Sequence, residues 1–221
     1  MSHGEWYLEK ENIEKLLEMI GQGCKVLAAT VGQFHPILKA VFLASAKILS
    51  NPDGKEAKFF TEQFEKINQK LDSIQDEMNE ITLELELSTM NKQNFDYEVN
   101  INTQYEKFKE FVSANKTNLE TRQDNFKKQY EITGRDKNID ALYEAVMKSA
   151  ILDTVVKLVK KDRKKVEQFC ARLKMKFFMG IVAVVAYSAL EGEYDEGMLK
   201  TWQNQMEEVE NRMQAAVNAC E

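Results

Sequence analysis

The part of this sequence that is best suited to chemistry is a run of basic side chains directly before the most apolar segment. Residues 157–176 hold nine Lys and Arg against two acidic residues, a net charge of +7, and residues 177–190 follow as FFMGIVAVVAYSAL. Each cation near an anionic leaflet contributes about 1 kcal/mol of attraction. The pattern therefore predicts contact with anionic lipid headgroups, and the alternative is an ordinary solvated helix face.

Two sets of candidate residues follow from this pattern. The candidate anionic-lipid contacts are Lys160, Lys161, Arg163, Lys164, Lys165, Arg172, Lys174 and Lys176. The candidate membrane-inserting residues are Phe177, Phe178, Ile181, Val184, Val185 and Leu190. A helix over residues 177–190 would span about 21 Å, which is short of the ~30 Å hydrocarbon core. We therefore expect this helix to be buried against residues 24–49 and to insert into a membrane only conditionally.

Other chemistry is poorly provided for. The chain has two histidines, His3 and His35, and three widely spaced cysteines, Cys24, Cys170 and Cys220. No GxSxG, P-loop, GxGxxG or HExxH pattern occurs. We therefore expect no enzyme activity, cofactor or metal, and the net charge of −6 argues against nucleic acid as a partner.

The same features bear on location. An odd number of widely spaced cysteines is typical of a protein whose thiols stay reduced. The N-terminal residues lack both the basic and the apolar region of a secretory signal. We expect a cytoplasmic protein that is peripheral to membranes or inserted in them.

The elements that must position these residues are predicted to be long helices. Two prolines in 221 residues leave few forced breaks. A heptad stripe predicts a helix over about 56–93, roughly 55 Å long, with Phe60, Phe64, Ile67, Leu71, Ile74, Met78, Ile81 and Leu85 on one face. An asparagine-rich corner at 91–102 and a second helix over 103–132 would complete a long hairpin, 56–132.

The rest of the pattern continues the bundle. A glycine, Gly134, is expected to end the second helix, and a helical pattern over 139–159 is expected to continue through the basic run into residues 177–190. After a loop at 191–197 the last helix carries an apolar stripe, Trp202, Met206, Val209, Met213, Ala216 and Cys220. The fold predicted for residues 1–221 is one all-α domain, an elongated antiparallel bundle with a hydrophobic head from 24–49 and 177–190.

Several segments resemble the rapunzel family, small helical vertebrate proteins. They include Gly32-Gln33-Phe34-His35-Pro36, FEKINQKLDS at 64–73, Ile81–Leu87 with Ser88-Thr89, and most specifically NKQNFDYEVNINTQYEKFKEF at 91–111. The likeness extends over about residues 25–190. It implies an all-helical protein with a late hydrophobic segment, associated with development and antiviral signalling, and it transfers no site residues. The predicted architecture is also similar to α-helical pore-forming toxins.

Two functional hypotheses from different classes follow. The first is a non-enzymatic, membrane-active bundle, similar to the pore-forming proteins, whose apolar head docks on or inserts into anionic membranes under the guidance of the basic run. The second is a soluble cytosolic coiled-coil scaffold or adaptor that binds helical protein partners, or further copies of itself, through its long helices. Sedimentation with anionic liposomes separates the two hypotheses.

Overall fold

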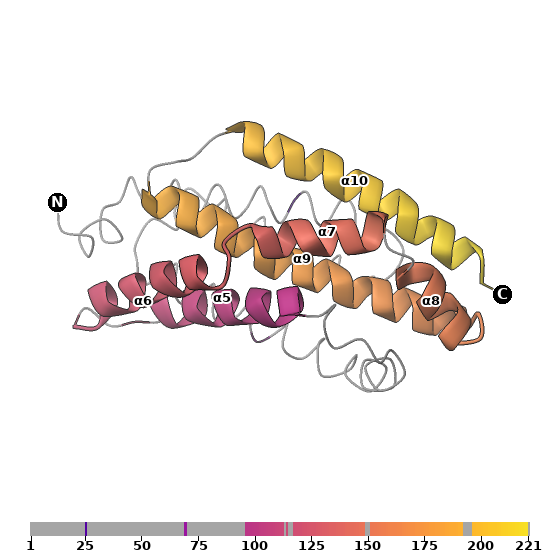
Figure 1. The fold of residues 1–221 in the computed structure, drawn as a ribbon, viewed down its shortest axis with the longest axis horizontal. Coiled ribbons are helices and arrows are strands. Elements are labelled where there is room, and N and C mark those ends of the chain that lie inside the picture. Colours follow the sequence, from indigo (N-terminus) through magenta and orange to yellow (C-terminus); the bar gives the residue numbers. More distant parts are fainter. Residues whose placement is uncertain are drawn as a thin grey trace.

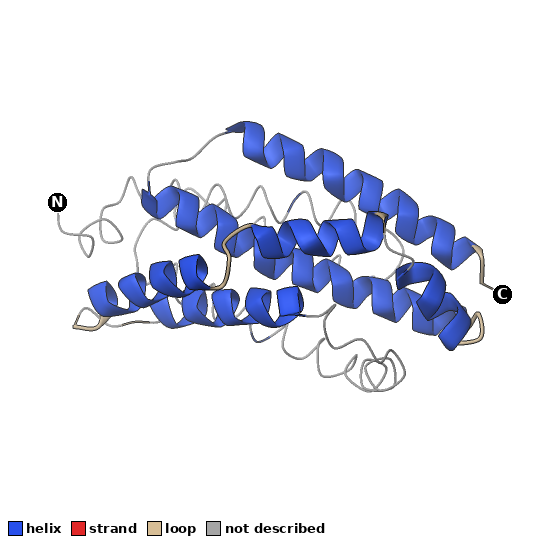
Figure 2. Ribbon diagram, viewed as in Figure 1, coloured by secondary structure: helices blue, strands red, loops and turns tan. Residues whose placement is uncertain are grey.

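The computed structural model describes residues 96–112, 114, 117–148, 151–191 and 196–220, together with Lys25 and Gln69. Its helices are α5 (Asp96–Val112), α6 (Leu119–Ile132), α7 (Lys137–Met147), α8 (Ile151–Leu158), α9 (Arg163–Glu191) and α10 (Glu196–Asn218). Within these residues the regular structure is entirely helical (Figure 2). The all-α class is confirmed, whereas the helix predicted at 56–93 and the apolar segment 24–49 lie outside the described residues except for Gln69 and Lys25.

The longest of these helices, α9, lies at the centre. It has 29 residues and is therefore about 43 Å long. From Val166 to Tyr187 nearly every side chain is buried, whichever way it points. A helix that is buried on nearly all sides needs neighbours on nearly all sides, and α5, α6, α7 and α10 all contact α9. Figure 1 shows α7 and α10 running antiparallel to it along the long axis.

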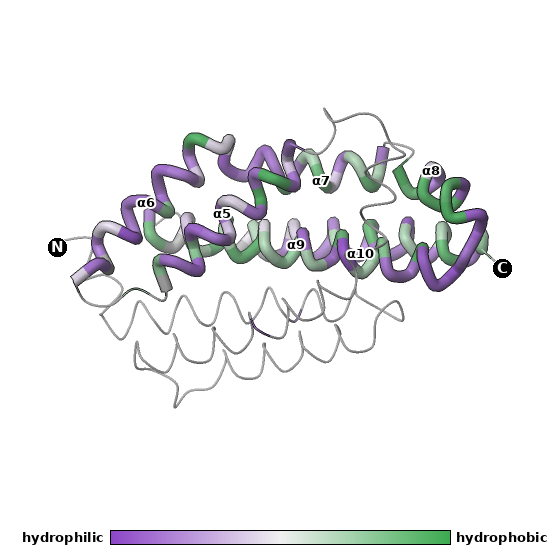
Figure 3. The backbone as a smooth tube through the Cα atoms, turned by 90° about the horizontal axis from the view of Figure 1, so that it is seen from below, coloured by the Kyte–Doolittle hydropathy of each residue, from purple (hydrophilic) through white to green (hydrophobic). Residues whose placement is uncertain are grey.

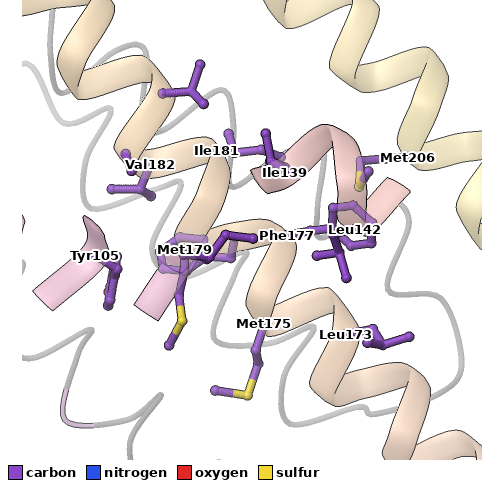
Figure 4. Packing of buried hydrophobic residues seen from close by; sticks show 14 of the residues in the cluster. Tyr105, Ile139, Leu142, Leu173, Met175, Phe177, Met179, Ile181, Val182 and Met206 are labelled. Atoms are coloured by element: carbon purple, nitrogen blue, oxygen red, sulfur yellow. The ribbon is translucent and has the colours of Figure 1, made fainter. Parts of the chain in front are cut away.

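The core forms where α9 meets its neighbours. Ile139 and Leu142 of α7 and Met206 of α10 lie toward Phe177 and Ile181 of α9 (Figure 4). These side chains belong to one continuous cluster of buried apolar residues that draws on every described helix. The mass of the bundle is therefore organised around the apolar run of α9.

The predicted helix over 103–132 is wrong, because the structure divides it into α5 and α6. The two helices form an antiparallel hairpin (Figure 1). The Phe126 ring packs edge-on against Phe108, with centroids 5.6 Å apart, and parallel to Phe111. An ion pair of 3.0 Å joins Arg122 on α6 to Glu110 on α5. The apolar stripe looked continuous because both helices point the same aromatic face inward, and periodicity alone does not reveal the turn between them.

The predicted corner at 91–102 is also wrong in its described part, since residues 96–102 form the first turns of α5. Asp96 and Glu98 lie in the first turn, where carboxylates interact favourably with the helix dipole. Asn100 donates a hydrogen bond to Asn138, 2.9 Å away, and Ile101 is fully buried. Tertiary contacts thus compensate for the low helix propensity of asparagine.

Gly134 ends α6 as predicted. Its φ is +98°, a conformation that suits glycine. The Gly134 N–H donates to the Glu131 carbonyl and the Arg135 N–H to the Tyr130 carbonyl, which is the hydrogen-bond pattern of a Schellman cap. The Gln104 amide of α5 donates to Thr133 Oγ1 and to the Arg135 carbonyl. This turn is therefore fastened to the middle of α5.

The continuous helix expected from 139 into the basic run is wrong as well. The structure has α7 and α8 in place of one helix, and α8 ends at Leu158 before α9 begins at Arg163. Between them Lys160 and Lys161 have φ values of 53° and 60°, which are uncommon for non-glycine residues. The Lys160 and Lys161 N–H groups donate to the Lys157 and Val156 carbonyls and so cap α8.

The last helix agrees with its predicted stripe. Trp202, Met206, Val209, Met213 and Ala216 are buried, and Cys220 is half-buried just beyond the end of α10. The stripe covers α7, α8 and α9.

A substitution at Gly180 tests the close approach of α9 to α7. A Cβ at this position would lie 2.8 Å from Ile139 Cδ1 and 3.2 Å from Ile139 Cβ. Overpacking of this kind costs about 1–3 kcal/mol, against a gain in helix propensity of about 1 kcal/mol. We expect Gly180→Ala to lower the free energy of unfolding by about 1 kcal/mol in urea titrations. In an Ile139→Ala background the same substitution should become stabilising, and an unchanged sign would contradict this packing.

Candidate functional site

The candidate membrane-inserting residues are all in α9 and all buried. Phe177, Phe178, Ile181, Val184, Val185 and Leu190 have exposed fractions of 0%, 1%, 2%, 6%, 0% and 7%. The predicted burial is confirmed. The expected partner, residues 24–49, lies outside the described residues, and the partners that the structure does describe come from α5, α6, α7 and α10. Among them Tyr105 of α5 packs edge-on against Phe178, with ring centroids 6.0 Å apart. None of the described helices is both long enough and apolar enough to span a bilayer.

Polar contacts hold the C-terminal end of the apolar run against α6. The Tyr187 hydroxyl donates to Glu131 over 2.7 Å, and its ring stacks on Tyr130 with centroids 4.4 Å apart. The Arg135 guanidinium lies over the Tyr187 ring, 5.4 Å from the ring centroid. Burial and the hydrogen bond to Glu131 raise the pKa of Tyr187 to about 12, so this hydroxyl remains a donor at physiological pH.

The basic run divides into two parts with different surroundings. Its first part, around the α8–α9 turn, is open to solvent, with Lys160, Lys161, Arg163 and Lys164 exposed and Lys165 half-buried. Figure 3 shows this turn as a hydrophilic segment, in purple, beside the hydrophobic residues of α8. Asp162 begins α9 by accepting a hydrogen bond from the Lys165 N–H over 3.2 Å. Leu158, 40% exposed, adds an apolar side chain beside the turn.

The second part of the basic run lies inside the bundle. Arg172 pairs with Glu98 of α5 over 3.1 Å, with side chains 14% and 7% exposed. One helical turn further, Lys176 donates to Asn102 over 2.6 Å and is itself buried. Because positions four apart share a helix face, these two cations bind α9 to α5. In this fold both cations have partners within the protein, and the lipid contact expected for them stays a prediction.

Lys174 points to the opposite side of α9 and is fully buried. Its Nζ lies 3.3 Å from Glu210 Oε2 of α10, yet neither atom has a hydrogen bond of good geometry. Burial, which outweighs the attraction of Glu210, lowers the pKa of Lys174 to about 8, and burial also raises the pKa of Glu210. Lys174 therefore does not reach the surface in this fold, and its lipid contact also stays a prediction.

The partners of the buried cations cannot be found by reasoning from the sequence. Glu98, Asn102 and Glu210 are distant in sequence from the basic run, and nothing local marks them. A signal for burial was nevertheless present in the basic run. Its exposed part is nearly contiguous charge, whereas Arg172, Lys174 and Lys176 alternate with Leu173, Met175 and Phe177. Isolated cations among large apolar residues are typical of paired, buried charges.

Removal of Arg172 should expose the difference between the two parts of the basic run. Arg172→Met leaves the Glu98 carboxylate buried without this partner, so we expect a loss of about 2 kcal/mol in the free energy of unfolding. The matched substitution Lys164→Met, at an exposed position, should change it by less than about 0.5 kcal/mol. Equal effects in chemical denaturation would contradict the assignment of Arg172 to the interior.

Val184→Asp tests the burial of the apolar run itself. An unpaired carboxylate would be placed among apolar neighbours, which costs several kcal/mol. We expect a large loss of thermal stability by circular dichroism, whereas Val99→Asp, at a position 61% exposed on α5, should be tolerated. If Val184→Asp changes neither thermal stability nor liposome association, residues 177–190 are neither core nor an insertion element.

Comparison with known proteins agrees with this all-helical arrangement. The chain is 24% identical over 226 aligned residues to the protein rapunzel of Danio rerio, and the alignment covers all of both chains. The resemblance to the rapunzel family is thus confirmed. No solved structure matches the chain. The model of the cephalotoxin-like middle helical domain matches residues 50–221, which include every helix described above. The chain therefore belongs to the family of the cephalotoxin-like middle helical domain.

Proposed function

We propose that this protein is a non-enzymatic, membrane-active helical bundle. It would dock on anionic membranes through the exposed α8–α9 turn and insert the apolar run of α9 only after a change of conformation. The observation that carries the proposal is that an exposed cationic turn leads directly into a helix that is buried on nearly every side. The helical toxin-like family of the chain supports the same class of function.

Electrostatics favours the α8–α9 turn as the docking surface. Residues 157–167 carry six basic and two acidic side chains. One of the acids, Glu167, is 3.1 Å from Arg163, and the other, Asp162, caps α9. At about 1 kcal/mol for each Lys or Arg near an anionic leaflet, the remaining lysines are sufficient for reversible attraction. Lys174 and Lys176 make no contribution while α9 stays in the bundle, since both are buried.

Conditional insertion follows from the burial of α9. The large apolar side chains of residues 177–190 each gain roughly 1.5–3 kcal/mol from burial in the bundle. A bilayer offers them a similar environment but no partner for Tyr187, which donates to Glu131 in the bundle. Docking is therefore expected to be easy and insertion to need a trigger. The proposed location is cytoplasmic, at the anionic face of a membrane.

Sedimentation with liposomes tests the docking step. We expect binding to vesicles of phosphatidylcholine and phosphatidylserine, no binding to phosphatidylcholine alone, and release at high salt because exposed charges are screened. The variant Lys160→Glu, Lys161→Glu, Arg163→Glu and Lys164→Glu should lose at least tenfold in affinity. A matched variant reverses four exposed lysines elsewhere, Lys128, Lys137, Lys148 and Lys200, and should retain most of the binding.

Equal losses in the two variants would mean that net charge alone drives association and that the α8–α9 turn is not a docking surface. Absence of binding at low salt would favour the scaffold hypothesis instead. That alternative depends on the heptad stripe at 60–85, which lies outside the described residues.

A further inference from the structure

The contact between α9 and α10 differs in kind from the contacts of α9 with α5 and α6. Toward α5, Arg172 has a hydrogen-bonded carboxylate and Lys176 a hydrogen-bonded amide oxygen. Toward α6, Tyr187 donates to Glu131. Toward α10, Lys174 Nζ and Glu210 Oε2 are 3.3 Å apart, and neither atom makes a hydrogen bond of good geometry. The cost of removing two ions from water is therefore least compensated at the α9–α10 contact.

Apart from this pair, the described residues of α9 and α10 make apolar contacts and one long polar contact. Met206 of α10 lies by Phe177 of α9 (Figure 4), and the hydroxyl of Ser188 is 4.0 Å from the sulfur of Met198. Two other polar contacts of α10 are near the surface: Tyr143 of α7 donates to Glu208, and Arg212 donates to Asp153 of α8. Exposed pairs of this kind contribute little to stability.

We propose that α10 is a releasable cover, which undocks from α9 while α9 remains on α5 and α6, and that the buried Lys174–Glu210 pair sets how readily it undocks. Undocking uncovers the face of α9 that holds Cys170, Lys174 and Phe177, positions that share one side of the helix. The inference does not require the membrane activity proposed above, and its test contains no lipid.

The pair gives this undocking a definite pH dependence. In the docked state burial lowers the pKa of Lys174 to about 8, whereas a solvated lysine has a pKa of about 10.4. The undocked state therefore holds the proton more tightly, so docking strengthens as the pH rises from about 8 toward 10. Burial raises the pKa of Glu210, so protonation of this carboxyl strengthens docking as well. Undocking is consequently easier near neutral pH than near pH 10.

The other ionisable groups near the pair do not reverse this sign. Cys170 lies beside Lys174 on the same face, and burial raises the pKa of its thiol to about 12, so it stays neutral. Glu167 of α9 is paired with Arg163, and the pKa of Cys220, which follows α10, is also raised by burial. The Tyr143 hydroxyl, whose pKa is raised to about 12 mainly by its hydrogen bond to Glu208, stays protonated below pH 10.

Cys170 is a built-in probe for the opening, because it is fully buried beneath α10. In a Cys24→Ser, Cys220→Ser background, its rate of modification by excess 5,5′-dithiobis(2-nitrobenzoic acid) is divided by the rate in the denatured chain at the same pH. The ratio gives the opening equilibrium. Protection should increase roughly tenfold between pH 8 and pH 9.5, as the linkage of Lys174 requires.

Substitution of the pair should remove this behaviour. Lys174→Met with Glu210→Leu should increase the protection of Cys170 at pH 7.5 by about tenfold and abolish its pH dependence. Glu210→Gln alone leaves Lys174 without a counterion and should reduce protection, which keeps the test decisive if the double variant does not fold. As a matched control, Lys200→Met with Glu207→Leu changes two exposed residues of α10 and should have no effect.

A second probe separates local undocking from global unfolding. Ala171 is buried, and it lies seven residues before Phe178, on the side of α9 that faces α5. In a Cys24→Ser, Cys170→Ala, Cys220→Ser background, Ala171→Cys should be modified more slowly than Cys170 and with a stronger dependence on denaturant. If the two positions show equal protection and equal denaturant dependence, α10 opens only when the whole bundle unfolds and the proposal is overturned. Unchanged protection in both pair variants would overturn the role of the Lys174–Glu210 pair.

Discussion

The structure depends above all on the need to cover α9 on all of its sides. Most helices of a globular protein bury one stripe and leave the opposite face in water, but α9 is buried on nearly all sides from Val166 to Tyr187. Each described neighbour can be understood as part of that cover. The α5–α6 hairpin lies along it, and α7 approaches so closely that Gly180 has no room for a side chain beside Ile139. The need to bury the side chains of α9 therefore determines how the other described helices are arranged.

The cations inside the bundle limit which arrangement is possible. Arg172 and Lys176 have acceptors on α5, and Lys174 lies beside the Glu210 carboxylate of α10, on the opposite side of α9. An apolar helix alone could rotate or slide against its neighbours with little change in buried area. Charged groups at fixed positions would lose their partners in such a shift, so they can select one register even where they add little stability.

The same features bear on how a buried apolar helix could serve a membrane-active protein. The exposed lysines of the α8–α9 turn and the buried side chains of α9 are continuous in sequence but opposite in environment. Attraction to an anionic surface would bring the turn to the bilayer without any change in the core. Exposure of the apolar run would need a cover to leave, and α10 carries the least compensated of the polar contacts that hold α9. The docking proposal and the releasable cover thus concern separate steps, and each can fail without the other.

Sequence patterns determined the helical class, the stripe of α10, the glycine cap of α6 and the burial of residues 177–190. These features follow from local periodicity and from the apolar character of the segment itself, which act through nearest neighbours along the chain. The turns that divide α5 from α6 and α8 from α9 were not predicted, because an apolar stripe can continue across a turn when both helices face one core. Likewise, seven residues of the predicted corner are helical because Asn100 and Asn102 hydrogen-bond to Asn138 and Lys176, far along the chain.

The division of the basic run was decided only by tertiary structure. Lys164 and Lys174 are the same residue type, ten positions apart in one helix, yet the first is exposed and the second is fully buried. What distinguishes them is the position of Glu210, which the folding of α10 brings to Lys174. Composition and spacing give the charge of a side chain. Whether that charge meets water, lipid or a carboxylate depends on contacts between segments that are distant in sequence, and only the packed fold defines these contacts.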